Sequence, residues 1–184
     1  MNAWIQRLLW VAGLVVALTA VNVTIAGHEK TLAKGRVVLL QLAPVDPRSL
    51  MQGDYMALRF EVATPILNAA TEAKLLDGYA VLTIDGNGVG TFSRLFTPGE
   101  TLADNAQKLQ FRTRNNGIRI VTDAYFFQEG TGDSFEAAKF GQFRVNADGT
   151  ALLVAMLDAD RRVIEPKLKL RNDDQSKGGV EVRG

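Results

Sequence analysis

The sequence contains no cysteine and a single histidine, His28. Disulfide bonds and thiolate metal sites are therefore excluded. A Ser-His-Asp or Cys-His arrangement needs a histidine to relay the proton, and zinc sites usually use two or three of them. His28 lies beside the apolar N-terminal run, from which it would have to fold back to reach a site in the body. We therefore expect no histidine-dependent catalytic site, no metal and no cofactor.

An excess of charge of one sign is also missing. The 184 residues include 21 Lys and Arg side chains and 20 Asp and Glu side chains. Arg7 is the only charged side chain in residues 1–26, so the rest of the chain carries 20 charges of each sign. Nucleic-acid binding depends on basic surfaces that neutralise phosphates, so nucleic acid is not an expected partner. The length favours one folded domain.

One long hydrophobic run dominates the N-terminal part of the chain. Residues 8–26 read "LLWVAGLVVALTAVNVTIA", and the polar side chains among them are Thr19, Asn22 and Thr24. As a helix this run spans about 28 Å, close to the thickness of the hydrocarbon core of a bilayer. Its Leu, Val and Ile side chains favour insertion by about 3–6 kcal/mol in total. We predict a transmembrane anchor at 8–26 after a short head at 1–7.

A cleaved signal peptide is the alternative interpretation of this run. Signal peptides usually have an apolar region of about 7–15 residues, followed by small residues at the cleavage site. The "TIA" before Gly27 is an acceptable site, but the run is longer than that range. An uncleaved signal anchor is therefore the favoured interpretation.

The orientation of the anchor rests on two opposing signals. Arg7 precedes the run, whereas Lys30, Lys34 and Arg36 follow it, and the positive-inside rule alone would keep the body in the cytoplasm. Long domains, however, translocate largely regardless of nearby charge, and a short N-terminal head is typical of a signal anchor. We therefore expect the N-terminus inside the cytoplasm and the body outside it.

The remaining chain has the pattern of a mainly β (α+β) fold with antiparallel strands. We expect a helical stalk at 27–36, a β-rich domain at 37–170 and a disordered tail at 171–184. Alternation of apolar and polar residues predicts half-buried strands, as at Met56, Leu58, Phe60 and Val62 and within Lys108–Arg114. Capping and stop signals predict two or three short helices, at 46–52, from Thr64 to about Leu76, and from Asp133 to Gly141.

The segment "PVDPRSLMQGDYMALRFEV" (44–62) gathers most of the candidate site residues. Asp46 suits a helix N-cap and Gly53 suits the C-terminal stop of that helix. Asp54 lies on the same strand face as Met56, where a buried carboxylate needs a partner, and Arg48 would supply a charge-assisted bond. The favoured interpretation is a structural corner, with ligand or partner contact and catalysis as alternatives.

Two further residues are candidates for binding. Tyr55 falls on the opposite strand face from Met56, where ring packing is favoured over exposed recognition. Glu129, in "YFFQEG", follows a predicted strand end. It would form a two-carboxylate glycan site with Asp54 if the two met, although a solvated turn acid is favoured.

Three arginines share one predicted hairpin: Arg112, Arg114 and Arg119. They would suit anionic lipid headgroups or a phosphate-bearing ligand, because a guanidinium group binds phosphate through two parallel hydrogen bonds. A solvated strand face is the favoured alternative.

The segment "GDYMALRF" (53–60) resembles the motif that names the GDYXXLXY family. Gly53, Asp54, Tyr55 and Leu58 match that motif, whereas a phenylalanine stands at its last position. The stretches "LAPVDPRSLMQ", "YFFQEG" and "FGQFRV…GTALLVAML" are similar to the family as well. The resemblance implies a bacterial, membrane-anchored protein without an established biochemical role. It also suggests a multi-pass membrane protein as partner.

These observations favour a non-enzymatic accessory or interaction module that serves a multi-pass membrane protein or an envelope ligand. One alternative is a membrane-anchored hydrolase, either glycan-acting or similar to signal peptidases. Against the latter, Ser49 lies after Pro47 rather than before it, and no lysine lies nearby in sequence. The other alternative is a lipid- or glycan-binding module that uses the Tyr55 face and the arginines.

Overall fold

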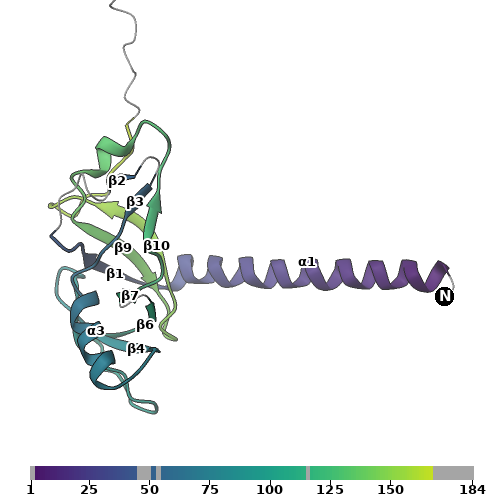
Figure 1. The fold of residues 1–184 in the computed structure, drawn as a ribbon, viewed down its shortest axis with the longest axis horizontal. Coiled ribbons are helices and arrows are strands. Elements are labelled where there is room, and N and C mark those ends of the chain that lie inside the picture. Colours follow the sequence, from purple (N-terminus) through teal and green to yellow (C-terminus); the bar gives the residue numbers. More distant parts are fainter. Residues whose placement is uncertain (1–2, 45–50, 53–54, 115–116, 168–184) are drawn as a thin grey trace, which may run out of the picture.

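The computed structural model describes residues 3–44, 51–52, 55–114 and 117–167. One long helix projects from a β-rich body (Figure 1). The elements are α1 (Ala3–Lys34), β1 (Arg36–Gln41), β2 (Met51–Gln52), β3 (Tyr55–Ala57), α3 (Ala63–Glu72), β4 (Asp77–Ile84), β5 (Gly90–Leu95), β6 (Ala106–Arg114), β7 (Gly117–Arg119), β8 (Ala124–Phe126), the 3₁₀ helix η1 (Gly132–Phe135), β9 (Phe140–Val145) and β10 (Ala151–Leu157). The predicted fold class is confirmed.

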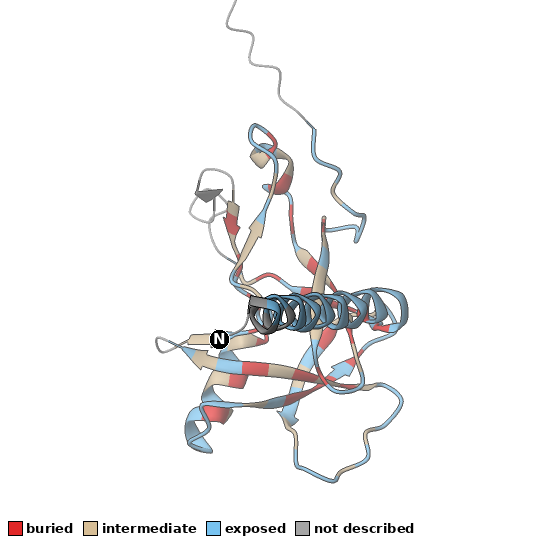
Figure 2. Ribbon diagram, turned by 90° about the vertical axis from the view of Figure 1, so that its right-hand side faces the viewer, coloured by how far each residue is buried: buried red, intermediate tan, exposed pale blue. Residues whose placement is uncertain are grey.

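Helix α1 is continuous from the apolar run through the expected stalk. Its segment Trp10–Lys34 is long and apolar enough to cross a membrane, and none of its most apolar 18-residue stretch is buried against the body. The side chains of Thr19, Asn22 and Thr24 donate to carbonyl oxygens four residues back, at 2.8, 2.8 and 2.9 Å. Lipid offers no hydrogen bonds, so these internal bonds suit an apolar surrounding. Figure 2, which looks along α1, shows the helix exposed in front of the body.

The body consists of three antiparallel sheets, with strand orders β1-β9-β10, β2-β3-β8 and β5-β4-β6-β7. Backbone hydrogen bonds join the first and third sheets through the turns of their hairpins. The Leu39 N–H donates to Gly88 O at 2.8 Å, and the Gln110 N–H donates to Gly149 O at 2.9 Å. These two sheets share the main core, in which Leu40, Leu82, Phe111 and Phe143 are fully buried.

The alternating segment of the motif is buried as predicted. The side chains that point inward are at most 7% exposed: Met56, Leu58, Phe60 and Val62. The ladder of β3 nevertheless ends at Ala57, and Phe60 returns to sheet pairing through an isolated bridge with Leu42. The alternation of apolar and polar residues therefore identified the side chains that enter the core, although the regular strand β3 is shorter than the alternating segment.

The helix expected from Thr64 to about Leu76 has different bounds. Its N-cap is Val62, which makes no side-chain capping bond, and Thr64 lies inside the helix. The helix ends through Lys74, which has a left-handed φ of 55°. The Leu75 N–H then donates to Ala70 O at 2.8 Å, the bond of a Schellman cap.

The expected stop residue, Gly78, lies instead in β4. A Cβ at this glycine would come within 3.0 Å of Phe111 Cζ. The glycine therefore makes room for a core ring and does not end the helix.

Replacing Lys74 with glycine is expected to stabilise the fold by about 0.5–1 kcal/mol. A left-handed conformation costs a non-glycine residue about 1–2 kcal/mol, and part of the gain is lost to the greater freedom of the unfolded chain. Urea unfolding measures the change. Glu72→Gly, placed inside the same helix end, is the control and is expected to destabilise by about 0.5–1 kcal/mol. Equal effects of the two variants would contradict the capping role of Lys74.

Two other predicted helices also differ from the structure. The pattern at Asp133 and Glu136 gives the 3₁₀ helix η1, whose preceding residue makes no side-chain capping bond, and Gly141 lies in β9. Phe135 is only 2% exposed, and its ring centroid lies 5.2 Å from that of Tyr125 and 5.3 Å from that of Phe127. This packing accounts for the short turn. Of the helix expected at 46–52, Met51–Gln52 form β2 instead, and the remainder lies outside the described residues.

Candidate functional site

The motif contributes two described site residues, Tyr55 and Leu58. Tyr55 opens β3 and is half-buried, with its ring centroid 5.7 Å from that of Phe126 on β8. It lies opposite Phe126 in the register of the two strands. This packing agrees with the structural interpretation of Tyr55. Four other candidates lie outside the described residues: Asp46, Arg48, Gly53 and Asp54.

Leu58 lies in a groove that we call the motif groove, with a volume of about 480 Å³. Its apolar lining includes Leu58, Phe60, Ala63, Leu67, Ile118 and Ile120. Its polar members include Arg59, Thr64, Thr122 and Asp123. A mainly apolar concavity with a few polar groups is the usual form of a binding site. The groove is larger than the three other cavities described below.

The motif groove is built from segments far apart in sequence. Helix α3 supplies one wall, and it lies on the side of the body away from α1 (Figure 1). The β7 region supplies another wall through Ile118 and Ile120. The segment after β3 supplies the side chains between them. A smaller cavity of about 120 Å³ is lined by residues that include Met56 and Phe135.

The residues proposed for catalysis are not brought together in the described part of the chain. Glu129 is exposed in the turn after β8, and its suggested partner Asp54 lies outside the described residues, as does Ser49. Neither Glu129 nor Tyr55 lines any of the four cavities described here. Within the described residues, no group of three His, Asp or Glu side chains is placed to hold a metal ion.

Arg112, Arg114 and Arg119 do come together. With Gln110, Phe111 and Val121 they line a cavity of about 200 Å³, which we call the arginine pocket. Val121 has a left-handed φ of 59°, which is strained for a β-branched residue by about 1–3 kcal/mol. The three arginines share the β6–β7 hairpin, as predicted.

The joint between α1 and the body is closed by hydrogen bonds. The Gly35 N–H donates to Thr31 O at 2.8 Å, and Arg144 Nη1 donates to Gly35 O at 3.1 Å. Asn146 Nδ2 donates to Thr31 Oγ1 at 2.7 Å. A Cβ at Gly35 would lie only 2.5 Å from Thr31 O, so the joint requires a glycine. The helix is thus fixed to the β9–β10 hairpin and does not end in a free linker.

Beside this joint lies a cavity of about 280 Å³ that includes the single histidine, His28, and Asp148. Asp148 accepts hydrogen bonds from the Thr150 hydroxyl at 2.7 Å and the Thr150 N–H at 2.8 Å. These two bonds lower the pKa of Asp148, against the opposing effect of its burial. The carboxylate therefore stabilises the β9–β10 turn.

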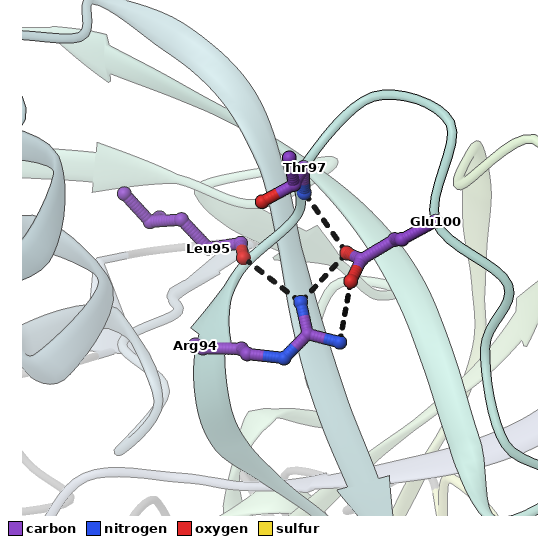
Figure 3. A network of polar contacts seen from close by, with 4 residues as sticks. All are labelled: Arg94, Leu95, Thr97 and Glu100. Carbon is purple, nitrogen blue, oxygen red and sulfur yellow. Dashed lines mark hydrogen bonds and ion pairs between the residues drawn. The ribbon is translucent and has the colours of Figure 1, made fainter.

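Arg94 and Glu100 form a network at the end of β5 (Figure 3). Two guanidinium nitrogens of Arg94 contact the two carboxylate oxygens of Glu100, each at 2.6 Å. The Thr97 N–H donates to the same carboxylate at 2.9 Å. The bond from Arg94, followed by the bond from Thr97, lowers the pKa of Glu100. The network closes the turn that follows β5.

The pKa of Glu100 is expected to lie below the ordinary glutamate value, about 4.3. Because the folded state favours the charged carboxylate, its stabilising contribution is present above that value and is lost as the pH falls through the folded pKa. Carbon-detected NMR titration of the Glu100 carboxyl measures the midpoint. Arg94→Gln is expected to raise the midpoint toward the ordinary value, and an unchanged midpoint would contradict the role of Arg94.

Sequence reasoning missed the motif groove and the helix joint. The joint had a weak signal, because Gly35 directly precedes a strand and follows a helix-forming segment. The groove had no such signal in the sequence, because its walls, helix α3 and the β7 region, are far apart along the chain.

Comparison with known proteins gives one positive finding. A family model described as "GDYXXLXY protein" matches residues 17–156, which is most of the chain and includes the motif segment. Neither a curated protein nor a solved structure matches the chain.

Proposed function

Since this chain belongs to the GDYXXLXY protein family, and since its head carries an open groove beside the family motif, we propose that it is a membrane-tethered, non-enzymatic binding module. Helix α1 anchors it in a bacterial inner membrane, and the head lies on the periplasmic side. The motif groove receives an apolar segment of a multi-pass membrane protein.

The tether is supported by the exposure of α1. A helix whose apolar stretch is not buried in the body would expose those side chains to water in a soluble protein. In a bilayer the same side chains favour insertion by roughly 0.3–0.6 kcal/mol for each Leu, Val or Ile. The hydrogen-bonded joint at Gly35 then holds the head at a set orientation to the helix.

The motif groove is the observation that carries the binding role. It presents the apolar side chains of Leu67 and Ile118 at an open surface, with Arg59 and Asp123 among its polar members. Open apolar surfaces of this kind mark interaction sites, whereas catalysis needs convergent titratable groups. The edge strand β7 lines the groove, and an extended partner segment would find unpaired backbone groups along such an edge.

Site-specific photocrosslinking in native membranes tests the proposed partner. A photoreactive side chain at Leu67, inside the groove, is expected to give one discrete adduct with an integral membrane protein. The same side chain at Leu76, which is 74% exposed and does not line the groove, is the control and is expected to give none.

A second variant decides whether an adduct reports on the groove. Ile118→Glu adds a charge to the apolar lining and is expected to abolish both the adduct and detergent co-purification of the partner, with the melting temperature of the head as the folding check. Adducts of equal intensity from Leu67 and Leu76, or none from either, would reject the groove as the docking site.

The proposed orientation has its own test. The chain has no native cysteine, so Thr97→Cys introduces a single reactive thiol into the exposed turn after β5. A membrane-impermeant maleimide is expected to label this thiol in intact spheroplasts as well as in lysed ones. Labelling only after lysis would place the head in the cytoplasm while leaving the anchor intact.

A further inference from the structure

The arginine pocket concentrates positive charge on one face of two paired strands. Arg112 and Arg114 are two residues apart on β6, so they share a face, and Arg119 on β7 lies directly opposite Arg112 in the register. Like charges directly opposite each other destabilise a sheet. The arrangement therefore works against the stability of the hairpin unless an anion lies nearby.

The charges of the pocket are only partly neutralised by the protein. Arg119 Nε lies 3.1 Å from Asp123 Oδ2. Among the described residues, Arg112 and Arg114 have no carboxylate within ion-pair distance, although Asp77 lies opposite Arg112 in the register. Within the described residues, two guanidinium groups thus line the cavity without an ion-paired carboxylate, and the planar guanidinium fork matches the oxygens of a phosphate.

Hydrogen bonds connect the strand that carries this pocket to the membrane-proximal end of α1. The Gln110 N–H, in the pocket wall, donates to Gly149 O in the β9–β10 turn. Asn146, in the same turn, donates to Thr31 of α1. Thr31 lies five residues beyond Ala26, the expected end of the span, which is a rise of about 7.5 Å. Headgroup layers extend about 5–8 Å beyond the hydrocarbon core, so this end of the head is near the level of lipid phosphates.

We propose that the arginine pocket binds the phosphate of an anionic lipid headgroup in the leaflet next to the head. The inference rests on the proposed anchoring of α1 and adds a second contact between the protein and the membrane. The lipid phosphate supplies the negative charge that Arg112 and Arg114 lack, and the Gln110 side chain adds an amide to the same cavity. Binding holds the β6–β7 hairpin against the bilayer surface.

Hydrogen exchange of the full chain in lipid nanodiscs tests this proposal. The discs contain phosphatidylcholine alone or an equal mixture of phosphatidylcholine and phosphatidylglycerol. The mixed discs are expected to slow amide exchange in β6 and β7 about ten-fold, the effect of a ligand present at about ten times its dissociation constant. The double variant Arg112→Gln/Arg114→Gln is expected to lose this protection, and Arg112→Lys/Arg114→Lys to keep part of it.

A control variant and a soluble anion distinguish the origins of any protection. Arg161→Gln/Lys167→Gln removes two exposed charges outside the pocket and is expected to retain full protection. Equal loss in this control would attribute the effect to net charge and overturn the proposal. Inorganic phosphate that protects β6–β7 equally in phosphatidylcholine discs would overturn the lipid as the source.

The outcomes also separate this inference from the proposed tether. A chain that enters the discs but shows no dependence on phosphatidylglycerol would overturn the lipid site alone. A chain that does not enter any disc would contradict the anchor, and the lipid site with it.

Discussion

Replacing Leu14 and Leu18 with arginine is expected to release the protein from the membrane. Both side chains are exposed on one face of α1, one helical turn apart. Each arginine at the centre of a span costs about 2.5–3.5 kcal/mol, so the two together cost about 5–7 kcal/mol. The exchange also removes two leucines, so the remaining eight Leu, Val and Ile side chains of the run favour insertion by only about 2.4–4.8 kcal/mol, which the cost of the arginines exceeds. The balance therefore changes sign.

Sedimentation of cell membranes after an alkaline carbonate wash measures this effect. The wild-type chain is expected in the pellet until detergent is added, and the double variant in the supernatant. Leu32→Arg makes the same kind of exchange beyond the expected span and is the control, expected to remain in the pellet. A wild-type chain that stays soluble at full length after cell breakage would contradict the anchor, whatever the variants do.

Local patterns in the sequence predicted the strands well because a half-buried strand needs only an alternation of side chains. In Lys108–Arg114 the alternation placed Leu109 and Phe111 in the core, at 1% exposure each. The same parity placed Arg112 and Arg114 on the opposite face, where the arginine pocket lies. Side-chain direction along one strand is set by the backbone alone, so it can be predicted without knowing the tertiary structure.

Helix ends were predicted less well because tertiary contacts decide them. Glycine is the usual residue in the left-handed position that ends a helix, yet here Lys74 takes that position. Gly78 lies in β4 instead, where its missing side chain leaves room for the Phe111 ring. The helix predicted from Asp133 to Gly141 is only the short 3₁₀ helix η1 for a similar reason, since aromatic packing of Phe135 stops the turn early.

The candidate site depended even more on long-range structure. Leu58 was predicted to be buried, but its position in a groove depends on helix α3 and on Ile118, sixty residues later in the chain. Pairing of Arg119 with Asp123 likewise followed from the course of the chain after β7. Spacing in a single sequence does not encode the groove, because its walls come from elements far apart in the chain. The pair of Arg119 and Asp123 is local, four residues apart, but it depends on the conformation of the chain after β7.

The largest loss of stability is expected from Phe143→Ala. Phe143 is fully buried on β9, the central strand of the first sheet, and its ring meets the Phe60 ring edge-on with centroids 5.3 Å apart. Removing a buried phenylalanine side chain costs about 3–5 kcal/mol, because the apolar contacts are lost and a cavity remains. That is a large part of the roughly 5–15 kcal/mol by which a typical domain is stable.

Urea unfolding measures this loss, and two variants determine its cause. Phe126→Ala removes a ring that is 75% exposed and is expected to cost at most about 1.5 kcal/mol, the value of its aromatic pair with Tyr55. Phe143→Leu keeps most of the apolar volume and is expected to fall between the two. Because Phe60 also lines the motif groove, a cavity at Phe143 withdraws support from the groove floor. Phe143→Ala is therefore expected to weaken crosslinking from Leu67 even where the head stays folded, and unchanged crosslinking at a reduced stability would show that the groove does not depend on this ring.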